Sequence, residues 1–113
     1  MTRGLLIVES APSSPDRVEE YHRWYDEVHI PQLLSFDLFV SARRFEPVGG
    51  VGAGVGAAEG AAEGPFVAVY ELEADDIAAA FAKYRAASAR GELDRSDALQ
   101  TDPPPRVRLL IER

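Results

Sequence analysis

The sequence predicts an α+β domain with the element order β-α-β-β-α-β. Four short segments, rich in apolar and β-branched residues, are too brief for helices and are typical of strands. Two longer segments, 15–29 and 76–90, carry apolar residues at helical spacing. Right-handed crossovers convert this order into a four-stranded antiparallel sheet with both helices on one face. The other face then carries apolar residues that the chain leaves uncovered, which predicts a homodimer.

Composition restricts the class of protein. The chain has 113 residues, 46% of them hydrophobic, which suits one domain over 1–113. A net charge of −7 predicts no nucleic-acid partner, because phosphate binding needs a basic patch. The absence of cysteine excludes disulfides and thiolate metal sites. The first apolar run is too short for a signal peptide or a membrane span, so we expect a cytoplasmic protein without a membrane partner.

The first half of the chain predicts a strand, a helix and a second strand. A buried strand is expected over 4–10, and a helix begins at Pro15, which suits a first helical turn. Pro31 disfavours helical geometry at the residue before it, so the helix is expected to end or bend at about His29. On a helical wheel Trp24 and His29 lie on opposite borders of an apolar arc formed by Val18, Tyr21, Tyr25 and Val28.

The second strand is expected over 38–46. Alternation places Phe39, Ser41, Arg43 and Phe45 on one face, with Arg44 on the other. The segment 48–64 is rich in glycine and alanine and predicts a flexible loop. It lacks the Lys-Ser/Thr ending of a phosphate-binding loop and precedes a strand, so it is not interpreted as one.

The second half predicts a strand over 65–73, a helix capped by Asp75 and ending near Gly91, and a last strand over 106–113. The polar segment 92–105, which ends in prolines, is expected to be irregular.

The chemically richest segment is the end of the first helix. Tyr21, Tyr25 and His29 lie one helical turn apart, and Trp24 lies beside them. A histidine at the rim of an apolar face can exchange a proton near neutral pH. Phenols and an indole nearby suit a flat aromatic or polyketide-like ligand. The alternative is that the three aromatic residues are core residues and His29 is a satisfied histidine at a helix end.

Two arginines of the second strand are further candidates. Arg43 and Arg44 point to opposite faces of the sheet, so one can bind a carboxylate or enolate oxygen of a ligand while the other faces the partner subunit. Alternatively, both form surface ion pairs.

No metal site is predicted. His22, Asp26 and His29 could form a set of two histidines and one carboxylate. However, His22 and Asp26 are expected on the solvent side of the helix, and residues seven apart are about 10 Å apart along its axis.

Two motifs resemble a known family. Arg23-Trp24-Tyr25-Asp26-Glu27-Val28-His29-Ile30-Pro31, followed by Ser41-Ala42-Arg43-Arg44-Phe45-Glu46, resembles the EthD-like branch of the dimeric α/β-barrel (ferredoxin-like) superfamily. The resemblance covers about the first half of the chain. It implies a pocket between helices and sheet in each subunit, with His29 and Trp24 at or near it and Tyr25 close by. The glycine-rich segment departs from the family pattern and leaves open what closes the pocket.

The sequence therefore supports three functional hypotheses. The first is a cofactor-independent enzyme of cyclase, isomerase, dehydratase or monooxygenase type, acting on an aromatic or polyketide-like molecule. His29 and Tyr25 would be catalytic, and Tyr21, Trp24, Arg43 and Arg44 would bind substrate. The second is a non-catalytic ligand-binding or accessory dimer, and the third is a stress-type protein whose pocket is vestigial.

Overall fold

The predicted fold class is confirmed. A computed structural model describes residues 1–48 and 64–113 of the chain. Its strands form one antiparallel sheet in the order β2-β3-β1-β4, the arrangement of a ferredoxin-like fold. The strands are β1 (Thr2–Ser10), β2 (Phe39–Phe45), β3 (Phe66–Ala74) and β4 (Arg106–Ile111). The predicted loop over 48–64 lies, apart from its end residues, outside the described residues.

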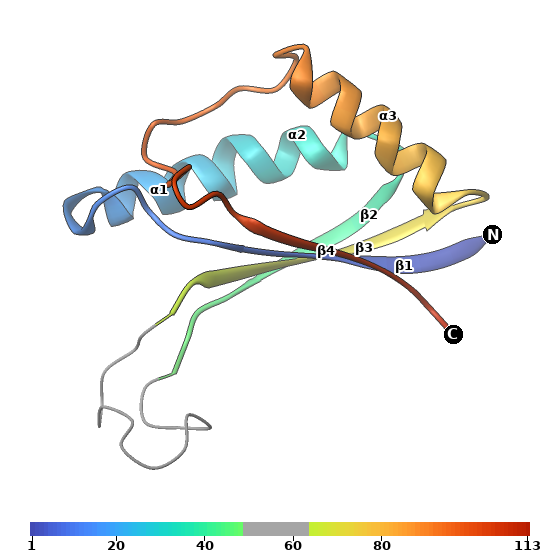
Figure 1. Ribbon diagram of the computed structural model, residues 1–113, viewed down its shortest axis with the longest axis horizontal. Coiled ribbons are helices and arrows are strands. Elements are labelled where there is room, and N and C mark those ends of the chain that lie inside the picture. Colours follow the sequence, from blue (N-terminus) through green and yellow to red (C-terminus); the bar gives the residue numbers. More distant parts are fainter. Residues whose placement is uncertain (49–63) are drawn as a thin grey trace.

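All helices lie on one face of the sheet (Figure 1). The first helical run consists of η1 (Pro15–Arg17), α1 (Val18–Trp24), η2 (Tyr25–His29) and α2 (Ile30–Leu34), and the second is α3 (Ile77–Ala89). Among the described residues, no element covers the opposite face, which we call the open face. In the same residues, no helix is long and apolar enough to cross a membrane.

The hydrophobic core fills the space between sheet and helices. Leu6, Tyr70 and Leu72 face the helices from the two central strands, and each is at most 2% exposed. Tyr21, Tyr25, Leu33 and Ile77 meet them from the helices. Alternation along β1 and β3 produces this face, because neighbouring side chains of a strand point to opposite sides.

Of the two outcomes predicted at about His29, an end or a bend, the first is wrong. The helix passes through a single π-helical turn, η2, and continues as α2 to Leu34. Within η2 the Ile30 N–H donates to the carbonyl of Tyr25, five residues earlier. Pro31 is the second residue of α2 and has no N–H, so the continuous helical run lacks one hydrogen-bond donor at this point. Ile30 has helical backbone angles (φ −60°, ψ −47°), although a residue before a proline prefers an extended backbone.

The predicted faces of the second strand are wrong at Phe39. The register of β2 against β3 shifts between Phe39 and Ser41, which marks a β-bulge. An extra residue reverses the alternation, so Phe39 faces the helices and is 5% exposed. It therefore shares the helix side with Arg44, while Arg43 lies on the open face.

The helix α3 begins one residue later than expected. Asp76, and not Asp75, accepts a hydrogen bond from the Ala79 N–H (3.0 Å) and caps the helix. Gly91 follows the helix end at φ +77°, a conformation that favours glycine.

Candidate functional site

A cavity of about 440 Å³ lies between the first helical run, α3 and the sheet. Trp24, Tyr25 and His29 line it from one side, and Tyr84 of α3 lines it from the other. Its floor and ends are mostly apolar and are formed by Leu6, Val8, Leu33, Leu99, Pro105 and Val107. An apolar cavity with a few polar groups on its walls is the usual form of a small-molecule site.

The π-helical turn assembles the polar wall of this cavity. Trp24 and His29 are five residues apart, which on a regular α-helix separates two side chains by about 140°. In the structure their rings stack, with centroids 4.7 Å apart and planes inclined by 22°. The expectation that they border the apolar arc on opposite sides is therefore wrong. Extra residues in a helical turn often occur at functional sites, because they redirect side chains.

His29 is a neutral histidine within this wall. Burial lowers its pKa to about 4, because the cavity solvates the charged form poorly. Its Nδ1 is buried and has no hydrogen-bond partner among the described residues. The Tyr25 ring contacts the imidazole edge to face, at 5.0 Å between centroids. In the described part of the chain His29 is thus not the satisfied helix-end histidine of the alternative interpretation.

Phenol groups gather around the imidazole. Burial raises the pKa of Tyr25, and the nearby Tyr70 and Ser10 hydroxyls only partly oppose this. Burial also raises the pKa of Tyr84 and of Tyr70. The Tyr70 hydroxyl is buried without a hydrogen-bond partner among residues 1–48 and 64–113. These phenols stay protonated at neutral pH, and the two that line the cavity, Tyr25 and Tyr84, can donate hydrogen bonds to a ligand.

Tyr21 lies behind the cavity and does not line it. The side chain is fully buried, and its hydroxyl shares a hydrogen bond of 2.7 Å with the Ser10 hydroxyl. Its ring contacts the Tyr25 ring edge to face at 5.5 Å. The structure gives the predicted substrate-binding residue Tyr21 a supporting position under Tyr25.

Arg44 is held by the outer side of the first helix. Its guanidinium donates to the Asp26 carboxylate (Nη1–Oδ1 3.0 Å) and lies 3.0 Å from His22 Nδ1. The same guanidinium lies over the Tyr25 ring, 4.5 Å from its centroid. Since Arg44 can only donate, His22 accepts at Nδ1, and desolvation and the arginine charge lower the pKa of His22. His22 and Asp26 therefore bind Arg44, and Asp26 lies on the solvent side, as expected, with its side chain 59% exposed.

Arg43 is far from the cavity. It lies on the open face, with its guanidinium 5.9 Å from the centroid of the Phe45 ring. The two arginines do point to opposite faces, as predicted, but neither lines the cavity beside His29.

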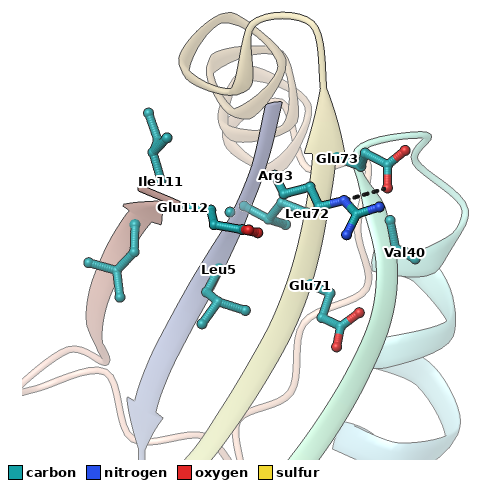
Figure 2. A pocket seen from close by; sticks show the side chains of 10 residues that line it. Arg3, Leu5, Val40, Glu71, Leu72, Glu73, Ile111 and Glu112 are labelled. Atoms are coloured by element: carbon teal, nitrogen blue, oxygen red, sulfur yellow. Dashed lines mark ion pairs between the residues drawn. The ribbon is translucent and has the colours of Figure 1, made fainter. Parts of the chain in front are cut away.

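A second, larger hollow of about 610 Å³ lies on the open face. Figure 2 shows its charged rim, with Glu71, Glu73 and Glu112 around Arg3 and with Leu5 beside them. The dashed line marks the Arg3–Glu73 ion pair (Nε–Oε2 3.9 Å). Among the described residues its lining contains no histidine, tyrosine or tryptophan.

Sequence reasoning missed the side of the cavity formed by α3. Phe81, Tyr84, Arg85 and Ser88 all line the cavity. They follow the spacing i, i+3, i+4 and i+7, which marks one helix face and could have identified them. Among the described residues, no group of three histidine, aspartate or glutamate side chains is close enough to hold a metal ion.

Comparison with known proteins identifies no relative. No family model matches the sequence, and neither a curated protein nor a solved structure matches the chain.

Proposed function

We propose that this chain is a small cofactor-independent enzyme that moves a proton on an aromatic or polyketide-like molecule bound beside His29. The proposal includes the EthD-like relationship and the cytoplasmic location, both of which rest on the sequence alone. The observation that carries it is the neutral imidazole, with a buried unpartnered nitrogen, on the wall of an apolar cavity lined by Trp24 and Tyr25.

The proposed chemistry begins with proton removal by His29. A neutral imidazole accepts a proton from a carbon next to a substrate carbonyl, and the C–H electron pair becomes the enolate. Tyr25 and Tyr84, both protonated, can donate hydrogen bonds to the enolate oxygen. The negative charge beside the imidazolium then favours its charged form. Return of the proton to another carbon completes an isomerisation. In a dehydration the enolate expels a β-hydroxyl group, the C–O bond breaks, and the proton held by His29 goes to that oxygen, so water leaves. A monooxygenase would use dioxygen as co-reactant.

A non-catalytic ligand-binding role is the second candidate. The pKa of His29, about 4, is well below the value near the working pH that suits a general base. If the bound ligand does not raise this pKa, His29 serves as a hydrogen-bonding group only.

Hydrogen–deuterium exchange separates the two candidates. A thermal-shift screen against aromatic polyketides and quinols, with His29→Ala in parallel, identifies ligands of the cavity. In D₂O, we expect the protein to accelerate exchange at the acidic carbon of 2-tetralone, measured by proton NMR. His29→Gln should lose about 100-fold of this acceleration. His22→Gln is the matched control and should retain it, because His22 contacts Arg44 outside the cavity.

Two results would contradict the enzyme proposal. If His29→Gln accelerates exchange as well as the wild-type protein, His29 is not the base. If ligands shift the melting temperature without any exchange, the ligand-binding role is supported instead.

The open face supports the proposal of a homodimer. Strand register places Leu5, Ile7, Val69 and Leu110 together in its middle and pairs Val67 with Glu9 nearer one end. At one end the face carries three glutamates and one arginine, shown in Figure 2. The other end carries three arginines and one glutamate, namely Arg43, Arg106, Arg108 and Glu9.

This charge distribution is self-complementary. A two-fold axis between two stacked sheets, running across the strands, places the acidic end of each copy over the basic end of the other. The apolar middle of each sheet is then covered by the same residues of the second copy. We propose that the dimer forms in this antiparallel orientation.

Charge reversal tests the dimer. In analytical ultracentrifugation we expect Arg43→Glu on β2 and Glu71→Arg on the neighbouring β3 each to weaken the dimer by about 10-fold or more, and their combination to recover most of the loss. Arg23→Glu, on the exposed side of α1, is the control with the same charge change. A wild-type protein that stays monomeric at tens of micromolar, or a double variant as weak as either single one, would contradict the proposal.

A further inference from the structure

The cavity beside His29 has a charge opposite to that of the protein. The chain carries 19 acidic and 12 basic side chains. Yet the lining of the cavity contains a single permanently charged side chain, Arg85 of α3, and no carboxylate, among the described residues. A cavity with apolar walls weakens screening, so one cation at its edge attracts an anionic ligand more strongly than it would in open water.

Arg85 is placed and available to bind an anion. Its guanidinium lies over the Phe81 ring, 5.8 Å from the centroid, which aims it along the cavity wall. The positive charge of Arg85 lowers the pKa of the neighbouring Tyr84 phenol, although burial raises this pKa by more. No carboxylate among residues 1–48 and 64–113 forms an ion pair with it.

The arginines predicted from sequence to bind a ligand anion cannot do so in this cavity. Arg44 is bound to Asp26 and His22 (Nη1–Oδ1 3.0 Å to Asp26), and its side chain is only 16% exposed. Arg43 lies on the open face, on the other side of the sheet. Among the three arginines, Arg85 of α3 is thus the one that can bind an anion in this cavity.

We propose that the ligand of this cavity is a flat aromatic molecule with a carboxylate, bound by Arg85 at the cavity edge and packed through its ring against Trp24 and Phe81. The inference rests on the proposed function and names its substrate class. The guanidinium offers two parallel donors to a carboxylate, which sets the orientation as well as the affinity. Such anchoring presents the far side of the ring system to His29, across the cavity from α3.

A matched pair of probes tests the inference. 2-Naphthoate and neutral 2-naphthamide share one ring system and differ in charge. By isothermal titration calorimetry, we expect the wild-type protein to prefer the naphthoate by about 10-fold or more, which corresponds to one charge-assisted contact. This preference should decrease as salt is added, because Arg85 is exposed to solvent. Shifts of the indole N–H resonance of Trp24, the one tryptophan of the chain, report binding in the cavity.

The decisive variant is Arg85→Gln. We expect it to bind naphthoate about 10-fold more weakly and naphthamide within about twofold of the wild-type affinity. The control is Arg90→Gln, since Arg90 follows the same helix but pairs with Glu92 and does not line the cavity. Circular dichroism confirms that each variant is folded.

The outcomes separate this inference from the proposed function. Equal binding of both probes to the wild-type protein, or an undiminished naphthoate preference in Arg85→Gln, overturns the role of Arg85 and leaves the proton-transfer proposal standing. Failure of both probes to shift the Trp24 resonance would count against the cavity as a binding site, and so against both proposals.

Discussion

Acid should destabilise the wild-type chain more than its His29→Gln variant, by about 3 kcal/mol in unfolding free energy between pH 6.5 and pH 4. In the folded chain burial lowers the pKa of His29 to about 4, whereas the unfolded chain has the ordinary value of 6.5. Between these values the unfolded state binds more protons, so unfolding becomes easier as the pH falls. The stabilising effect of the neutral imidazole is complete above pH 6.5 and is lost towards pH 4.

The groups around His29 are consistent with a lowered pKa of its imidazole. Tyr25 faces it from its own helical run, and Tyr84 and Arg85 face the same cavity from α3. The lining holds no carboxylate among the described residues that could stabilise an imidazolium. In the His29→Gln variant the side chain does not titrate, and glutamine is polar and similar in length to histidine.

Urea unfolding at fixed protein concentration, followed by circular dichroism from pH 7.5 to pH 4, measures the difference. His22→Gln serves as control, because it removes the other histidine while leaving His29 in place. Unfolding free energies of the wild-type and His29→Gln proteins that run parallel with pH would show that His29 is solvated in the folded chain. They would also remove the neutral imidazole from the proposed mechanism.

Gly4→Ala should cost about 3 kcal/mol or more of unfolding free energy. A Cβ at this position would lie 2.3 Å from the carbonyl oxygen of Leu110 and 2.9 Å from Cδ1 of Ile77. The first is a backbone atom of β4, so it can move only if the pairing of β1 with β4 opens. Overpacking against atoms that cannot move is among the most destabilising single changes.

Gly91→Ala is the control for glycine replacement in general. Nothing lies within 4 Å of the added Cβ there, but the residue has φ +77°, so we expect a loss of about 1 kcal/mol from the backbone conformation alone. Thermal or urea unfolding of the two variants compares the costs. A loss at Gly4 no larger than that at Gly91 would show that β1 packs less closely against β4 and the start of α3 than described.

Hydropathy patterns along the chain were sufficient for the element order and the sheet. Strand alternation and helical spacing are local properties, and the rule on right-handed crossovers limits how such elements connect. The cap of α3 differed by one residue, Asp76 in place of Asp75, because neighbouring acidic residues can cap a helix equally well. The end of the first helical run differed by more, since it lies at Leu34 and not at about His29. The bulge that turned Phe39 towards the helices has no comparable signal in its sequence.

The sequence by itself singled out Trp24, Tyr25 and His29, the residues of the first helical run that line the cavity, together with Tyr21, which does not line it. Only the tertiary structure decided how they meet, because the stacking of Trp24 on His29 depends on a π-helical turn that regular helical spacing does not anticipate. It also decided that Arg85, and neither Arg43 nor Arg44, lines the cavity. Which side chains share a cavity depends on contacts between segments far apart in the chain, and such contacts leave little trace in local periodicity.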